Sequence, residues 1–190
     1  MSASTRHVSR AAEAADEGLR RVAAVFGAVR DEPIRLPYAH LVASPGRAAD
    51  LPLAIELVYE GYLLHYRQSR ALAPRLSPET LLLAGDYLYA HGLSLVAQAG
   101  DMGAVAVLTR LMAVCSYLRV QKAPFAVDDG LWELTALAVG AGDGPCRAAA
   151  AAAFDRIDRL IAAARTGDLP PAVTAGLAAV RACAADAQEG

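Results

Sequence analysis

The sequence is poor in aromatic residues and has no excess of either charge, and both shortages narrow the possible functions. Aromatic residues make up 6% of the 190 residues, whereas hydrophobic residues make up 55%, mainly Ala and Leu. Lys and Arg total 18 against 20 Asp and Glu, which gives a formal net charge of −2. Because phosphate binding needs a concentrated basic surface, this balance argues against a nucleic-acid partner.

Cysteine is scarce, and long apolar runs are missing. Cys115, Cys146 and Cys183 are widely spaced, odd in number and not part of a Cys-x-x-Cys motif, so we predict reduced structural thiols rather than metal ligands or nucleophiles. No apolar stretch reaches about eighteen residues without Asp, Arg or His, and no apolar run follows Arg6 and Arg10. We therefore predict no transmembrane segment and no secretory signal, and expect a cytoplasmic protein.

Strand-like alternation of Val, Ile and Thr is also almost absent, which favours an all-α fold. Apolar residues recur at helical spacing throughout the chain, and 190 residues suffice to bury a core without metals or disulfides. We predict a single-domain helical bundle over residues 1–190, with an N-terminal helical region at 1–30. The predicted helices are 1–29, 38–43, 48–68, 78–99, 101–122, 131–141, 148–164 and 170–185. Ser77, followed by Pro78 and Glu79, is a typical helix start.

Two consecutive predicted helices, 78–99 and 101–122, carry seams with alternating spacings of four and three residues. Gly85 and Gly92 lie in the first seam, and each costs about 1 kcal/mol of helix propensity relative to Ala, which indicates that another helix approaches closely. We predict that residues 78–122 form a hairpin, either alone or together with a partner chain, and treat it as a candidate dimerisation hairpin. The predicted interface comprises Leu81, Gly85, Asp86, Leu88, Gly92, Leu95, Leu108, Leu111 and Cys115.

Asp86 stands out in this interface because the helical turns around it are almost wholly apolar. A buried carboxylate needs a partner, which Arg110, Arg119 or a tyrosine hydroxyl could supply. Asp86 either sets the register of a subunit interface or makes an intrachain hydrogen bond.

Three segments resemble, in order, motifs of the trans-isoprenyl diphosphate synthase family, and the resemblance spans roughly residues 34–137. Residues 82–88, Leu-Leu-Ala-Gly-Asp-Tyr-Leu, resemble the family's Leu-Ala-Gly-Asp-Tyr/Phe/Ala-Leu run. Residues 54–59, Ala-Ile-Glu-Leu-Val-Tyr, resemble its Ala-x-Glu-Leu-Ile-His turn. Residues 34–37, Ile-Arg-Leu-Pro, stand where the family has Gly-Lys-Arg-x-Arg-Pro, and retain one arginine. The resemblance implies a shortened bundle of the isoprenoid-synthase type.

The family's first metal motif is replaced in this chain. Members hold magnesium between two aspartate-rich motifs to ionise an allylic diphosphate, and magnesium requires carboxylate and phosphate oxygens. Where the first motif has Leu-Ile-His-Asp-Asp-x-x-x-Asp, this chain has the degenerate set His65, Tyr66, Arg67 and Arg70. Since arginine repels a metal ion, the resemblance implies a scaffold without the reaction.

The second aspartate motif has only a faint counterpart. Residues 153–160, Ala-Phe-Asp-Arg-Ile-Asp-Arg-Leu, resemble the family's Ala-Phe-Gln-Ile-x-Asp-Asp-x-x-Asp and would keep Asp158 alone. The alternative is a solvated helix face on which Asp155 pairs with Arg159 at i,i+4. Neither interpretation rebuilds a magnesium site.

No other pattern in the sequence supplies replacement chemistry. His65 and His91 could face each other and bind zinc, but no third ligand is placed by the sequence, and core histidines are the alternative. Asp128 and Asp129 are interpreted as a helix N-cap rather than a metal site. A phosphate loop, a Gly-x-Ser-x-Gly elbow and a His-Glu-x-x-His motif are all missing. We predict no catalytic residue, cofactor or metal ligand.

The resemblance implies a function without catalysis. In some bacterial members of the family, a small subunit without the aspartate motifs supports a catalytic partner and shapes its product length. We predict such an accessory subunit, inactive alone, with magnesium only in its catalytic partner, or alternatively a homodimer. A second hypothesis is a prenyl-lipid carrier whose apolar tunnel is lined by Gly61 and Tyr62, which otherwise pack in the core. An enzyme with a different site is disfavoured because no titratable residues converge.

Overall fold

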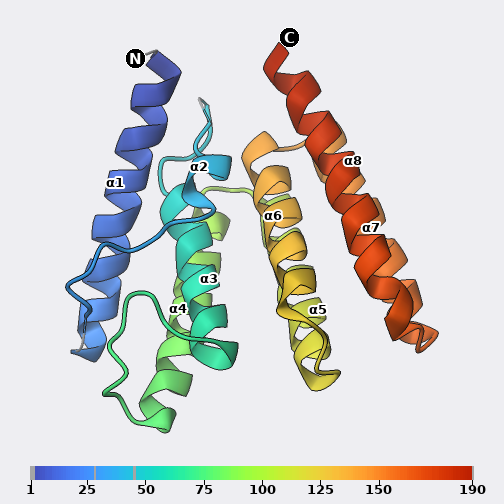
Figure 1. The fold of residues 1–190 in the computed structure, drawn as a ribbon. Coiled ribbons are helices and arrows are strands. Elements are labelled where there is room, and N and C mark those ends of the chain that lie inside the picture. Colours follow the sequence, from blue (N-terminus) through green and yellow to red (C-terminus); the bar gives the residue numbers. More distant parts are fainter. Residues whose placement is uncertain (1–2, 28, 45, 190) are drawn as a thin grey trace. The chain divides into compact units, whose positions relative to one another are not determined.

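The chain is predominantly helical, which confirms the all-α prediction (Figure 1). The computed structural model describes residues 3–27, 29–44 and 46–189. Within these residues the only β contact is an isolated bridge between Val29 and Leu72. The elements are α1 (Ala3–Ala23), η1 (Ala24–Phe26), α2 (Ala39–Val42), α3 (Leu51–Tyr66), α4 (Pro78–Gln98), α5 (Met102–Val120), α6 (Phe125–Ala141), α7 (Pro145–Ala162), η2 (Thr166–Asp168) and α8 (Leu169–Glu189).

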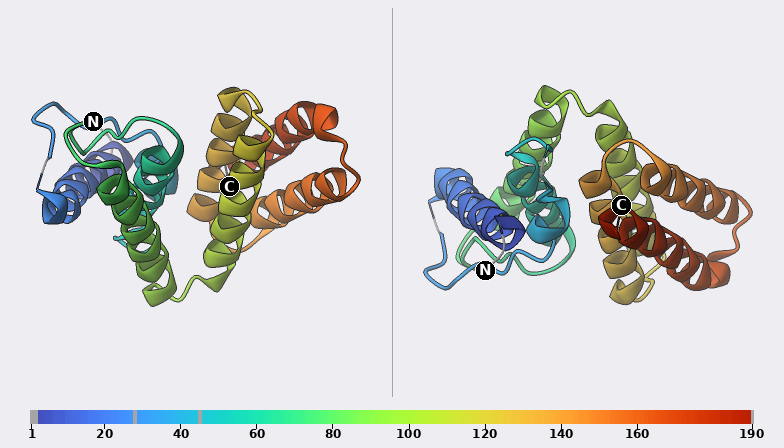
Figure 2. Two further views of the ribbon diagram at one scale, coloured as in Figure 1. Left: turned by 90° about the horizontal axis from the view of Figure 1, so that it is seen from below. Right: turned by 90° about the horizontal axis from the view of Figure 1, so that it is seen from above.

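The chain divides into two compact units, residues 1–101 with α1 to α4 and residues 102–190 with α5 to α8. The boundary falls inside the predicted hairpin 78–122, so α4 and α5 belong to different units. Each unit has its own buried helix contacts, and Figure 2 shows the helices of both from two further directions. Each unit is therefore described by itself.

Helix α3 is the centre of the first unit, and α1, α2 and α4 all pack against it. Its residues from Leu51 to Leu63 are buried with the exception of Leu53, as expected for a helix that is apolar almost all round. Leu57 of α3, Leu19 of α1 and Leu88 of α4 are fully buried in one shared core. This core fixes both the carboxyl end of α3 and the loop that follows it.

Glycines let α3 and α4 approach closely, as the seam in the sequence predicted. A methyl group added to Gly92 would lie 2.7 Å from the carbonyl oxygen of Ala54, and one added to Gly61 would lie 2.9 Å from that of Gly85. No side chain fits at such distances without a shift of backbone. The approaching helix is thus α3 of the same chain, whereas the sequence had suggested α5 or a second subunit.

The second unit is built on α6, α7 and α8, with α5 packed against α6 and α7. Trp132 of α6, Phe154 and Ile157 of α7 and Val180 of α8 are fully buried. Helix α6 begins at Phe125, six residues before its predicted start. Asp128 therefore lies within the first turn of the helix and does not cap it. Its carboxylate is fully buried and accepts a hydrogen bond of 2.8 Å from Arg119, so the N-cap interpretation of Asp128 and Asp129 is wrong.

Several helix ends follow local signals. The Ser77 hydroxyl accepts a hydrogen bond from the backbone N–H of Thr80, which confirms Ser77 as the N-cap of α4. Gly100, with φ of 77°, follows the carboxyl end of α4 as expected. The first helix ends earlier than predicted, since α1 stops at Ala23 and Gly27 turns the chain with φ of 82°.

Helix α5 is long and apolar enough to cross a membrane when only length and composition are considered. Core helices of many proteins meet the same criterion. The residues of α5 that pack inward include Leu108, Leu111, Val114 and Leu118, all of which are buried. This is weak evidence against the prediction that no segment spans a membrane.

Candidate functional site

The four residues that replace the aspartate motif lie where α3 ends. His65 and Tyr66 are the last two residues of α3, and Arg67 and Arg70 belong to the loop that follows. They do not converge on one point. The Arg67 guanidinium lies over the Tyr62 ring at 5.6 Å, whereas Arg70 turns back along α3.

Arg70 is paired with two buried glutamates on α3. Glu56 and Glu60 are one helical turn apart, so their carboxylates share a face, and both side chains are 0% exposed. Nη1 of Arg70 lies 2.7 Å from Oε2 of Glu56, and its Nε lies 2.8 Å from Oε2 of Glu60. The Arg70 guanidinium also lies over the Tyr59 ring at 4.7 Å and donates to the carbonyl oxygen of Arg35. We call Glu56, Glu60 and Arg70 the buried ion cluster.

The second carboxylate oxygens of the buried ion cluster hold two chain connections in place. Oε1 of Glu56 accepts hydrogen bonds of 2.7 Å from the backbone N–H groups of Tyr38 and Ala39, at the start of α2. Oε1 of Glu60 accepts from the Ser69 hydroxyl and from the N–H groups of residues 70 and 71. Every carboxylate oxygen therefore has a partner within the protein, as buried charges require.

Burial and the opposite charges within the buried ion cluster shift the pKa values of Glu56 and Arg70. Burial is the largest influence on Glu56 and raises the pKa of its carboxyl, although Arg70 and the N–H groups of Tyr38 and Ala39 act in the opposite direction. Burial also disfavours the charge on Arg70, but Glu56 and Glu60 outweigh it and raise the pKa of the guanidinium. In the buried ion cluster, the pKa of the Glu56 carboxyl and that of the Arg70 guanidinium therefore both lie above their ordinary values.

Aromatic rings extend from this cluster along α3. Tyr59 contacts Tyr38 at 4.8 Å between ring centroids and stacks with Tyr62 at 6.0 Å, and Tyr62 contacts Tyr66 at 5.5 Å. The imidazole of His65 stacks on Tyr89 of α4 at 5.2 Å. Tyr38 thus packs the start of α2 against α3, and Tyr89 packs α4 against α3.

The histidines form no metal site. His65 and His91 stack on different tyrosines of α4, Tyr89 and Tyr87 respectively. Nε2 of His65 lies 3.2 Å from Oδ1 of Asp86 without the alignment of a hydrogen bond. Among the described residues, no group of three or more His, Cys, Asp or Glu side chains could hold a metal ion.

Asp86 is not the buried carboxylate that the sequence suggested. Its side chain is 67% exposed, and it contacts α3 through the His65 imidazole at 3.2 Å. The two proposed arginine partners are engaged elsewhere, Arg110 with Asp155 and Asp158 and Arg119 with Asp128. The expectation of an intrachain core contact at Asp86 is therefore wrong.

Most of the predicted interface seam is buried inside the chain. Gly85, Leu88 and Gly92 pack on α3, and Leu108, Leu111 and Cys115 of α5 are 0% or 1% exposed. Because these six residues are buried within their own chain, they could contact a second chain only if the chain unfolded around them. Leu81 and Leu95 are half-buried, so Asp86 alone of the predicted set is well exposed.

The exposed side of α4 is apolar around Asp86. Leu82 is 54% exposed, Leu83 65% and Tyr87 43%, and one edge of the Tyr87 ring is covered by Phe26. These residues recur at helical spacing, so they form one stripe with Asp86. We call Leu82, Leu83, Asp86 and Tyr87 the outer α4 face.

The predicted tunnel residues are packed against other side chains and backbone. The space beside Gly61 is filled by the Gly85 carbonyl and the Tyr89 ring, and Tyr62 is 0% exposed between Tyr59 and Tyr66. Gly61 thus serves the helix contact, and core packing, which was the alternative, accounts for both residues.

The segment that faintly resembles the second aspartate motif lies on a solvated face of α7. Asp155 and Asp158 are each more than half exposed, and both accept from Nη2 of Arg110 at 2.7 Å. The solvated face is confirmed, but the partner of Asp155 is Arg110 of α5 and not the predicted Arg159. Because Arg110 pairs with both carboxylates, a magnesium ion could bind them only by displacing its guanidinium.

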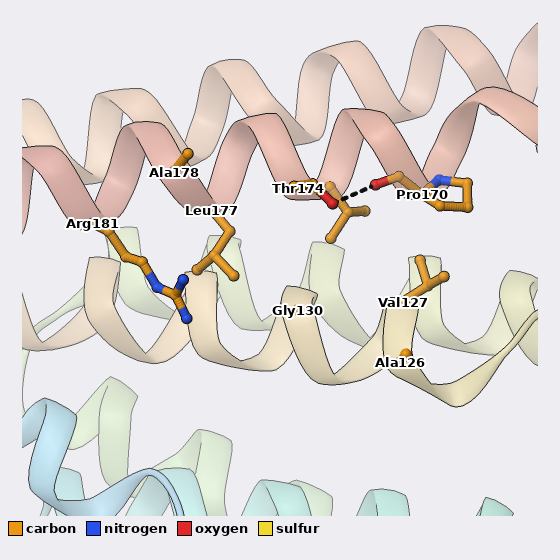
Figure 3. Close-up of a pocket in the computed structure, with 9 residues that line it drawn as sticks. Ala126, Val127, Gly130, Pro170, Thr174, Leu177, Ala178 and Arg181 are labelled. Atoms are coloured by element: carbon orange, nitrogen blue, oxygen red, sulfur yellow. Dashed lines mark hydrogen bonds between the residues drawn. The ribbon is translucent and has the colours of Figure 1, made fainter.

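The second unit has an open groove between α6 and α8, with a volume of about 320 Å³ (Figure 3). Val127 of α6 and Leu177 of α8 point into it, and Thr174 is tied to its own helix through the Pro170 carbonyl. Arg181 at one end is paired with Glu133, so its charge is already compensated. The groove is a shallow apolar surface without an exposed reactive group.

Comparisons with protein-family models, with curated proteins and with solved structures found no match in any of the three. The geometry therefore carries the functional argument. It offers a buried ion cluster with structural partners on every oxygen and an exposed apolar stripe on α4, and among the described residues it offers no group of three or more His, Cys, Asp or Glu that could hold a metal ion.

Proposed function

We propose that this chain is a non-catalytic accessory protein that binds a catalytic trans-prenyl diphosphate synthase and changes the activity and product length of that partner. The observation that carries the proposal is the placement of Arg70. In the segment that resembles the family's first aspartate motif, this arginine occupies the two buried carboxylates of α3. A divalent cation would have to displace a paired guanidinium to reach them, which is unfavourable.

The outer α4 face supports the proposal with a surface on which a partner can dock. Leu82, Leu83 and Tyr87 expose apolar side chains within the run that resembles the family's Leu-Ala-Gly-Asp helix. Exposed apolar stripes flanked by polar residues are typical of protein interfaces. This surface replaces the buried seam as the proposed contact, and we assign the contact to a helix of the catalytic synthase.

The test is co-expression with a prenyl diphosphate synthase that has both aspartate motifs and is encoded in the same genome. We expect a stable complex in size-exclusion chromatography with light scattering, and a change in the chain length of the prenyl product. L83E should abolish both, because it places a charge in the centre of the outer α4 face.

The matched control is V120E, because Val120 is a helical valine that is 77% exposed and belongs to α5 of the other unit. It should leave the complex intact. A chain that forms only homodimers, or a complex that L83E and V120E weaken equally, would contradict the proposal.

A further inference from the structure

Two of the three cysteines lie together in the second unit. Cys146 is in the first turn of α7 and Cys183 is near the end of α8, and the antiparallel packing of these helices brings the two positions to the same end. Both residues line one open cavity of about 330 Å³, together with Asp143, Pro145 and Asp186. The cavity connects this thiol pair to solvent.

The two thiols are close enough to influence each other. Burial raises the pKa of the Cys146 thiol, and the neighbouring Cys183 raises it further through its charge and a hydrogen bond. Cys146 is 4% exposed, whereas Cys183 is half-buried and faces the cavity. The two sulfurs therefore differ in access, and Cys183 is the one that a small reagent meets first.

The third cysteine provides an internal control. Cys115 lies on α5, is 1% exposed and does not line this cavity. Buried thiols of this kind are inert toward oxidants. Of the three cysteines, Cys146 and Cys183 are the two that line this cavity.

We propose that Cys146 and Cys183 are a peroxide-reactive pair that closes reversibly to a disulfide. In the first step the Cys183 thiolate attacks one oxygen of a hydroperoxide, the O–O bond breaks, and the products are a Cys183 sulfenic acid and water or an alcohol. In the second step the Cys146 sulfur attacks the Cys183 sulfur, the S–S bond forms and the S–O bond of the sulfenic acid breaks, and the hydroxyl group leaves as water with the proton of the Cys146 thiol. Across the two steps, the hydroperoxide is reduced and the two thiols are oxidised to the disulfide. One thiol proton ends in the water or alcohol of the first step, and the other ends in the water of the second step.

The consequence is a covalent tie between the start of α7 and the end of α8, which a dithiol reductant reverses. A group of three ligands for a metal ion is missing from the described residues, so the pair is assigned to redox chemistry and not to metal binding. This inference is independent of the proposed partner.

The test is peptide mapping of the full chain after treatment with hydrogen peroxide, with free thiols alkylated under denaturing conditions. Trypsin places each cysteine in its own peptide, Cys115 in 111–119, Cys146 in 123–147 and Cys183 in 182–190. We expect peptides 123–147 and 182–190 to become linked while 111–119 stays alkylated, and dithiothreitol to restore alkylation of all three.

Mixing ¹⁵N-labelled with unlabelled protein before oxidation distinguishes a bond within one chain from a bond between chains. The proposal predicts linked peptides of a single isotope. In C146S, Cys183 should be trapped by dimedone as the sulfenic acid, and in C183S, Cys146 should remain alkylated. C115S should behave like the wild type.

The wild-type map is decisive even where a variant folds poorly. Conversion of Cys183 to the sulfinic or sulfonic acid with Cys146 still alkylated would overturn the proposal. Linked peptides of mixed isotopes, or oxidation of Cys115 at the same peroxide dose, would overturn it equally.

Discussion

Replacing Arg70 by Met removes the counter-charge from two carboxylates that have no access to solvent. The Met side chain keeps an apolar stem beside Tyr59 but makes none of the contacts that Arg70 makes with Glu56, Glu60 and the Arg35 carbonyl. Uncompensated buried charge costs far more than the loss of a surface ion pair. We expect the free energy of unfolding at pH 7 to fall by about 3–5 kcal/mol.

The pH dependence of R70M gives this prediction a distinct signature. Without Arg70 the pKa of Glu56, already raised by burial, rises further, so the folded chain holds a proton that the unfolded chain has lost. A group with a raised folded pKa contributes less stability as the pH increases through that value. The loss caused by R70M should therefore be larger at pH 8 than at pH 5.

The assay is urea denaturation followed by circular dichroism at several pH values. The triple variant E56Q/E60Q/R70M should recover part of the loss, because it removes the charges together with their counter-ion. R21M is the matched control, since Arg21 pairs with Glu17 on the surface and both side chains are 74% exposed. It should change the stability by about 0.5 kcal/mol or less.

A loss below about 1 kcal/mol for R70M would refute the reasoning, because it would equal that of an ordinary exposed pair. A loss that is independent of pH would refute the assignment of the effect to buried carboxylates. Equal stability of R70M and the triple variant would show that charge compensation is not the cause.

Three further predictions concern stability and are measured by the same urea titrations. In E56Q the free energy of unfolding should depend less on pH than in the wild type. Because the pKa of Glu56 is raised in the folded chain, the wild type should lose stability relative to E56Q as the pH rises from the ordinary value of 4.5 through the folded pKa. Parallel curves of stability against pH for the two proteins would contradict this. G92A should lower the free energy of unfolding by about 1–3 kcal/mol, because the added methyl group would lie 2.7 Å from the Ala54 carbonyl oxygen, and this outweighs the better helix propensity of Ala. The control S94A, on the exposed side of α4, should be nearly neutral. Equal effects of the two substitutions would refute the close contact. S77A should cost about 1 kcal/mol through loss of the N-cap of α4, and no loss would show that the cap hydrogen bond is dispensable.

Local signals in the sequence predicted the helices well where the chain itself determines them. Ser77 and Pro78 start α4 because cap geometry depends on a few neighbouring residues. The start of α6 was missed because Asp128 looks like a cap in sequence, whereas its partner is Arg119 on the preceding helix. That contact is tertiary, and helix propensity cannot reveal it.

The glycine seam of α4 shows the same division between local and tertiary information. The spacing of Gly85 and Gly92 correctly indicated a close helix contact, but not which helix makes it. The partner is α3, so the seam is core and the outward side of α4 became the exposed apolar stripe. The inside and outside of this helix were assigned in reverse because leucines occur on both sides.

The buried ion cluster was only partly visible in the sequence. Glu56 belonged to a segment noted for its resemblance to the synthase family, and Arg70 to the degenerate motif, but Glu60 drew no attention. Two acids one turn apart in an otherwise apolar helix are a signal that could have been used, since buried carboxylates demand a partner. That partner is Arg70, and it reaches the two acids only because the loop after α3 folds back along the helix. The sequence alone does not reveal this tertiary arrangement.

The most direct test of the central claim is a binding titration between the purified chain and the catalytic synthase, with magnesium-dependent diphosphate release measured in the same samples. The account predicts no release by the chain alone, saturable binding to the synthase, and loss of binding in L83E but not in V120E. Magnesium-dependent diphosphate release by the chain alone, or no binding to the synthase at any concentration, would contradict it.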